Sequence, residues 1–172
     1  MLVEDPSTGG KATGLLGLPS QWVPRFLSIS ADLFRRWCSA GSARSLASIV
    51  SDADRDELER AIANLDPRTG TFRLIVRSNA VDEDLNQRGA LLSERADSTA
   101  DGVLTAAEYV FRHAFDVRPR PSLGLIVQRF TNRVMYGHLS NLRRVSEEPR
   151  SWACETSPFK VLFPVISRAS GQ

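Results

Sequence analysis

Two amphipathic helical segments alternate with two apolar, strand-like runs along this chain, and that alternation limits the folds open to it. Within residues 52–65 and 99–114, apolar residues recur at the three- and four-residue spacing of one helical face. The run FRLIV (72–76) alternates as a strand does, and SLGLIVQRF (122–130) is nearly continuous, as in a strand buried on both faces. Helices interleaved with strands predict an α/β or α+β domain.

Weaker signals place further elements around this framework. Pro24 disfavours the α region at Val23, so the stretch that follows is expected to be extended. Ser51 with Asp54 three residues later forms a loose capping box for the helix at 52–65. A glycine-rich loop is expected to run into a short helix at 9–18. A further helix is expected at 31–40, capped by Ser30 or Asp32 and ended by Gly41. The remaining strands are expected at 90–93, 133–140, 151–155 and 160–166.

Composition excludes several classes of function. The chain has 172 residues and a formal net charge of +2, which is too small to make nucleic-acid binding the default. No apolar run approaches the roughly 20 residues of a membrane span, and the N-terminus lacks the pattern of a signal peptide. Cys38 and Cys154 have no CxxC partner and are expected to be buried thiols. A cytoplasmic protein is expected.

The basic residues are unusual in kind, because 20 of the 22 are arginine and only Lys11 and Lys160 are lysine. Coding composition is the simplest reason for such a bias. A lysine that persists in this background can serve where a compact, flexible point charge is needed in place of a planar fork. Charge is also uneven: residues 51–108 carry a net −6 and residues 112–150 a net +5, which indicates a solvated basic face or a cleft for an anion.

Two segments are candidates for phosphate binding. GGKAT (9–13) is not a Walker A loop, because Asp5 and Ala12 stand where that motif needs Gly and Ser or Thr. Its glycines still allow backbone N–H groups to approach an oxyanion beside Lys11. Arg77 follows an apolar strand and opens a polar loop reaching Arg88, a place where ligand sites occur; a loop held by Arg–carboxylate pairs is the structural alternative.

The two histidines are poor catalytic candidates. His113 lies off the apolar stripe of its helix, and the GHLSN segment around His138 lacks the GxSxG pattern of a nucleophile elbow. No acid lies close in sequence to orient either ring. A Ser-His-Asp triad is therefore unsupported, and the glycines of residues 9–17 do not follow a strand in Rossmann register.

Together, three segments resemble a known family. GGKATGLLGL followed by WVPRFLSIS is similar to the opening of phosphoenolpyruvate synthase and pyruvate, phosphate dikinase. LIVRSNAVDEDLNQRG resembles their Val-Arg-Ser-Ser-Ala…Glu-Asp…Ala-Gly loop, and GLIVQRF resembles their Val-Val-Gln-Met strand. The similarity covers most of residues 9–140, with the Arg-Ser loop its most specific part. Rifampicin phosphotransferase shares the same ATP-binding module, so the resemblance does not choose among these relatives.

The resemblance implies an α+β fold of the ATP-grasp type, with a first subdomain at 9–120 and a hinge strand and the beginning of a second subdomain at 121–172. It implies that Lys11 and Arg77 contact the ATP phosphates and that the segment Gln128, Arg129 and Phe130 forms the hinge beside the adenine. In the family, ATP with Mg²⁺ phosphorylates a histidine on a separate swivelling domain, which then passes the phosphoryl group to pyruvate or another acceptor.

Departures from the family pattern bear on activity. Asn79 stands where the family has Ser, and the segment YGHLSN (136–141) replaces the usual Gly-Val-Phe-Thr. The Mg²⁺ ligands and the swivelling histidine domain have no counterpart here, so they are expected in another part of the parent protein or in a partner chain. The first hypothesis is the ATP-binding portion of a phosphotransferase, inactive by itself. The alternative is a non-catalytic interaction module derived from the same fold, with the stretch 160–166 as a pairing edge.

Overall fold

The chain divides into two units in this computed structural model, residues Met1–Phe130 and Thr131–Gln172. The structure describes residues 2–4, 9–41, 43–67, 70, 73–80, 92–115 and 122–130. It also describes the backbone of three strands at 136–140, 151–157 and 165–170.

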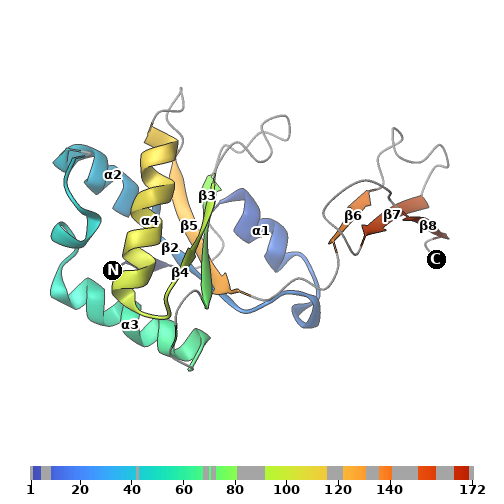
Figure 1. Cartoon of the computed structure of the whole chain (residues 1–172), viewed down its shortest axis with the longest axis horizontal. Helices are drawn as coiled ribbons and strands as arrows, with labels where there is room; N and C mark the ends of the chain where they lie inside the picture. The colour runs from blue at the N-terminus through green and yellow to red at the C-terminus, as the bar shows by residue number, and fades with distance from the viewer. Residues whose placement is uncertain are drawn as a thin grey trace. The chain divides into compact units, whose positions relative to one another are not determined.

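The first unit is built on a five-stranded antiparallel sheet with the order β1-β2-β5-β3-β4 (Figure 1). The strands, in that order across the sheet, are β1 (Val3–Glu4), β2 (Phe26–Ile29), β5 (Leu123–Arg129), β3 (Leu74–Ala80) and β4 (Ser93–Ala96). The helices are α1 (Gly10–Leu16), α2 (Ala31–Ala40), α3 (Asp52–Leu65) and α4 (Ala100–Phe115), with short 3₁₀ turns η1 (Ser20–Trp22) and η2 (Leu46–Ser48). The α+β class predicted from the sequence is confirmed.

One face of the sheet packs against α2, α3 and α4 to form the main core. Successive side chains of a strand point to opposite faces, so Leu74 and Val76 of β3 lie on the same face as Val127 of β5. Aromatic side chains fill the space between these helices: the rings of Phe34 and Phe111 lie 4.9 Å apart between centroids. In contrast, α1 contacts β3 but adds no residue to this core, and Figure 1 shows it on the other side of β3 from α4.

The helix boundaries follow the caps expected from the sequence. Ser30 Oγ accepts the Asp32 N–H at 3.1 Å at the start of α2, and Ser51 Oγ accepts the Asp54 N–H at 3.1 Å at the start of α3. Gly41 ends α2 with a φ of 89°, a conformation that favours glycine. No helix among the described residues is long and apolar enough to cross a membrane.

Three boundaries differ from the sequence-based expectation. The strand predicted at 90–93 is β4, which covers Ser93–Ala96. Strand β3 continues through Ala80 where a polar loop beginning at Arg77 was predicted, because β5 pairs with every residue of β3 from Leu74 to Ala80. β5 itself lies in the middle of the first sheet, so the chain divides after Phe130 and not at residue 121. The rest of the predicted polar loop, residues 81–88, lies outside the described residues.

The second unit contains a three-stranded antiparallel sheet with the order β6-β7-β8. Its strands are β6 (Tyr136–Ser140), β7 (Ser151–Ser157) and β8 (Val165–Ser170). Two of them match the strands predicted at 133–140 and 151–155. The predicted pairing strand at 160–166 overlaps the described residues only at its last two positions, which begin β8.

Candidate functional site

Arg77 lies on the face of the sheet opposite to the main core. It alternates with Val76 along β3, and the register pairs it with Ile126 of β5. Its Nη1 donates a hydrogen bond to Gln128 Oε1 at 3.2 Å, which joins two of the residues predicted for the site across neighbouring strands. Gln128 is only 5% exposed, so its amide is fixed in orientation by the sheet.

Lys11 reaches the residue next to Arg77. Its Nζ donates to Ser78 Oγ at 3.2 Å, although the two residues are 67 positions apart in the sequence. The contact forms beyond the end of β4, whose pairing with β3 stops at Arg77 and leaves Ser78 to Ala80 paired with β5 alone. The Gly-Lys segment at the start of α1 therefore contacts the Arg-Ser segment of β3, although the two are far apart in the sequence.

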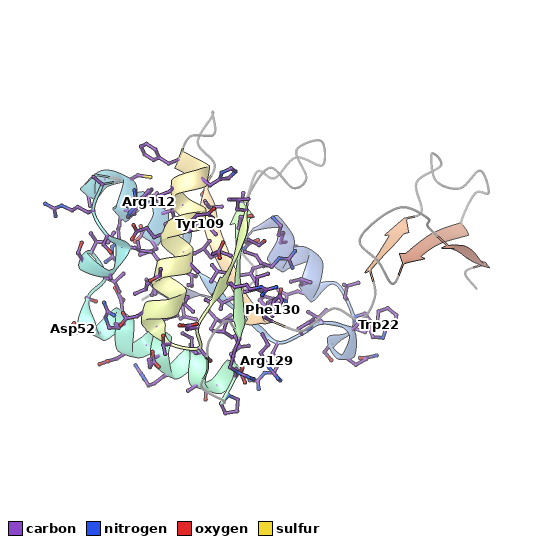
Figure 2. All side chains as sticks on the ribbon, in the orientation of Figure 1. Trp22, Asp52, Tyr109, Arg112, Arg129 and Phe130 are labelled. Carbon is purple, nitrogen blue, oxygen red and sulfur yellow. The ribbon has the colours of Figure 1, made fainter. Side chains whose placement is uncertain are left out.

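Arg129 and Phe130 lie at the other end of the same strands and have partners of their own (Figure 2). Arg129 Nε lies 3.7 Å from Asp66 Oδ1 at the C-terminal end of α3, where Asp66 also binds Arg73 Nε at 3.0 Å. The Phe130 N–H donates to the Arg73 carbonyl oxygen at 2.6 Å, so this donor is already used. The Phe130 ring lies 4.2 Å from the Arg95 guanidinium carbon, a cation–π contact.

These residues define a line along β3 and β5. Ser78 pairs with Leu125, and Phe130 follows five residues later, which corresponds to roughly 16 Å at about 3.3 Å per residue. Lys11 and Arg77 stand toward one end of that line and Phe130 at the other. The structure thus brings Lys11 against β3 and Gln128 into contact with Arg77, and Phe130 lies four residues along the chain from Ile126, the partner of Arg77.

Ser28 is a residue of this face that the sequence analysis did not single out. It pairs with Ile126, which in turn pairs with Arg77, so the three form one row across β2, β5 and β3. Its side chain is 1% exposed, and its Oγ has no hydrogen-bond partner among the described residues. A buried hydroxyl without a partner is uncommon. The only sequence signal was a polar residue inside an apolar strand.

Three other predicted features can be located. His113 is exposed on α4, as predicted, and the side chain of His138 lies outside the description. Cys38 is half-buried and its thiol is not in a disulfide, so the expected full burial was wrong for this residue. Among the described residues there is no group of three or more His, Cys, Asp or Glu side chains suited to a metal ion.

A surface hollow of about 470 Å³ lies elsewhere, between β4 and α4. None of the five residues predicted for the site lines it. Its walls come from the following residues: Glu94, Arg95, Ala96, Asp97, Gly102, Thr105, Ala106 and Tyr109.

Comparison with known proteins adds no assignment to this geometry. The sequence matches no protein-family model and no curated protein.

Exposed apolar side chains gather on the segment that follows the start of α1. Leu16, Leu18 and Trp22 are 52%, 48% and 70% exposed, and Figure 2 shows Trp22 extending away from the core. Large apolar side chains exposed within seven residues of one another indicate a surface that another polypeptide can cover.

Proposed function

We propose that this chain is the ATP-binding portion of a phosphotransferase similar to phosphoenolpyruvate synthase and pyruvate, phosphate dikinase. The observation that carries the proposal is the hydrogen bond from Lys11 Nζ to Ser78 Oγ. It brings the lysine of the glycine-rich segment to the residue next to Arg77. These are the two cations that the family resemblance assigns to the phosphates, and the contact of Lys11 with the residue beside Arg77 was not implied by their positions in the sequence.

The chemistry of phosphoryl transfer suits such a pair. Catalysis depends mainly on positioning the phosphates and neutralising charge that develops on their oxygens. Lys11 supplies a mobile point charge, and Arg77 supplies a planar guanidinium whose orientation is held by Gln128. In this proposal the Mg²⁺ ligands and the phosphate-accepting histidine belong to parts of the enzyme outside this chain.

The adenine is assigned to the segment Gln128 to Phe130 at the far end of β5. The separation of Phe130 from Arg77 along the strands supports this arrangement, because a nucleoside triphosphate is an extended molecule whose base and terminal phosphate lie far apart. Gln128 instead contacts Arg77. The Phe130 N–H is bonded to Arg73, so base recognition here falls to other groups of the segment, including the Phe130 ring.

Calorimetric titration with Mg²⁺-ATP tests the proposal. Loss of a charged hydrogen-bonding group is worth about 1.5–3 kcal/mol, so R77A and K11A are each expected to weaken binding by about 10- to 100-fold. Arg60→Ala is the matched control, since Arg60 is exposed on α3 and donates to the backbone oxygen of Asp56. Wild-type protein that shows no heat of binding at millimolar Mg²⁺-ATP would end the proposal.

A second candidate is a non-catalytic interaction module, and the exposed side chains of Leu16, Leu18 and Trp22 favour it. Such a module would bury this surface against another polypeptide. In this hypothesis that polypeptide is a second copy of the chain. Light scattering after size-exclusion chromatography distinguishes the candidates. A dimer that Trp22→Ser dissociates supports the interaction module, and a monomer at all concentrations contradicts it.

A further inference from the structure

Asn79 binds the backbone of the segment that carries Lys11. Its Oδ1 accepts two hydrogen bonds, one from the Lys11 N–H and one from the Ala12 N–H, each at 3.1 Å. Asn79 is 2% exposed, and it lies in β3 two residues beyond Arg77. One buried carboxamide therefore connects the first turn of α1 to the strand that carries the other cation.

Gly9 completes this contact by allowing the backbone to approach closely. Its φ is +95°, a conformation that L side chains rarely adopt. A Cβ added at Gly9 would lie 2.4–2.5 Å from the carboxamide atoms of Asn79, too close for any side chain. Thr13 then holds the Gly9 carbonyl oxygen with both its N–H and its Oγ1, each at 3.0 Å.

We propose that Asn79 is a positioning residue for Lys11. The lysine side chain has four rotatable bonds, so the position of its backbone determines which groups the ammonium can reach. The Asn79 carboxamide fixes the backbone from which the side chain departs, and the ammonium then reaches Ser78 Oγ. This inference rests on the proposed nucleotide site.

The contact also determines how the site holds phosphate. Because Asn79 Oδ1 occupies the Lys11 and Ala12 N–H groups, these two donors do not hold the ligand, and the side-chain charges of Lys11 and Arg77 do. Asparagine suits this role, since it offers an acceptor oxygen without a negative charge beside an anion site. An aspartate would make the same two hydrogen bonds but would oppose the phosphates.

Amide hydrogen exchange tests the contact without reference to any ligand. Removing the Oδ1 acceptor in N79A is expected to speed exchange at the Lys11 and Ala12 amides by about tenfold or more, because each loses its hydrogen bond. N79D keeps the oxygen and is expected to retain the protection. Exchange in N79A equal to that of the wild type would show that the contact does not hold this segment.

A double-mutant cycle tests the positioning role. N79A is expected to weaken Mg²⁺-ATP binding about fivefold when Lys11 is present and less than twofold in the K11M background. A general structural defect would instead weaken binding equally in both backgrounds, and that result would overturn the proposal. If the wild type binds no ATP, the proposed function fails and the positioning role for it falls too, while the exchange experiment still decides whether the contact exists.

Glycine substitutions test the same contact if N79A does not fold. Gly9→Ala places a methyl group against Asn79 and is expected to lower the melting midpoint and weaken ATP binding. Gly41→Ala is the matched control, because Gly41 has a similar φ of +89° and nothing lies within 4 Å of its added Cβ. Equal effects of the two substitutions would contradict a specific contact at Gly9.

Discussion

At the scale of single residues, two carboxylates, Asp54 and Glu108, form hydrogen bonds that link separate elements of the first unit. Burial alone would raise the pKa of the Asp54 carboxyl, but hydrogen bonds from Ser51 and Arg36 outweigh it and lower the pKa below the ordinary 3.8. Burial would likewise raise the pKa of Glu108, but the Leu46 N–H and the Arg112 guanidinium lower it below 4.5. Both groups thus favour the folded state when ionised.

Acid is therefore expected to destabilise the fold. With pKa values lower in the folded protein, the unfolded chain binds more protons at mildly acidic pH, so the free energy of unfolding falls as pH drops through about 4.5 and below. Urea titrations between pH 7 and pH 3 measure this loss. Glu108→Gln is expected to lower stability at pH 7 by about 1–2 kcal/mol and to make the acid-dependent loss smaller. An unchanged pH dependence in E108Q would contradict this role.

Residue type predicted part of the candidate site. The sequence indicates Lys11 because lysine is rare in this chain and follows two glycines here, and Arg77 because it follows an apolar run; the structure brings Lys11 to β3, the strand that contains Arg77. The roles of Asn79 and Ser28 could not be predicted in the same way. Each depends on which residue lies across the sheet or beneath a helix, and those neighbours are distant in sequence.

At the scale of elements, local signals located the helices and tertiary pairing determined the strands. The helix predicted at 52–65 has those same bounds in α3, because its cap and its apolar stripe are both local. β3 extends over polar Arg77, Ser78 and Asn79 because β5 supplies pairing partners through Ala80. Polarity alone suggested a loop there, since burial against another strand is not visible in a single segment.

The capping hydrogen bond of Ser51 is expected to stabilise α3 measurably. Ser51→Ala removes the acceptor of the Asp54 N–H and is expected to cost about 1 kcal/mol of unfolding free energy in urea titrations. Ser39→Ala is the control: Ser39 is exposed within α2, where alanine is a good helix former, so its effect is expected to stay within about 0.5 kcal/mol. A larger loss from S39A than from S51A would contradict the assignment of the cap.

At the scale of the whole molecule, the first unit contains every residue assigned to the nucleotide site. Among the described residues its hydrophobic core runs from Leu2 to Val127 in the sequence, and Lys11 and Arg77 also belong to this unit. The sequence resemblance had placed the dividing point before β5. The structure places it after β5, because that strand is paired on both sides within the first sheet.

A chain shortened to residues 1–130 is therefore expected to fold and to keep its ligand. Its far-ultraviolet circular dichroism should show a cooperative thermal transition, and its dissociation constant for Mg²⁺-ATP should stay within about threefold of the full chain, well under 1 kcal/mol. Loss of cooperativity would show that the first unit needs residues 131–172 to fold. Loss of binding in a folded fragment would place part of the site in the second unit.

The central claim is that Lys11 lies at the phosphates of a bound nucleotide, and the scarcity of lysine allows a direct measurement. The chain has only Lys11 and Lys160, so acetylation of each can be followed separately by mass spectrometry. Mg²⁺-ATP is expected to slow acetylation of Lys11 by about tenfold at saturation, while Lys160, the internal reference, changes less than twofold. The protection should disappear in R77A at the same ATP concentration. Equal acetylation of Lys11 with and without saturating Mg²⁺-ATP would contradict the account.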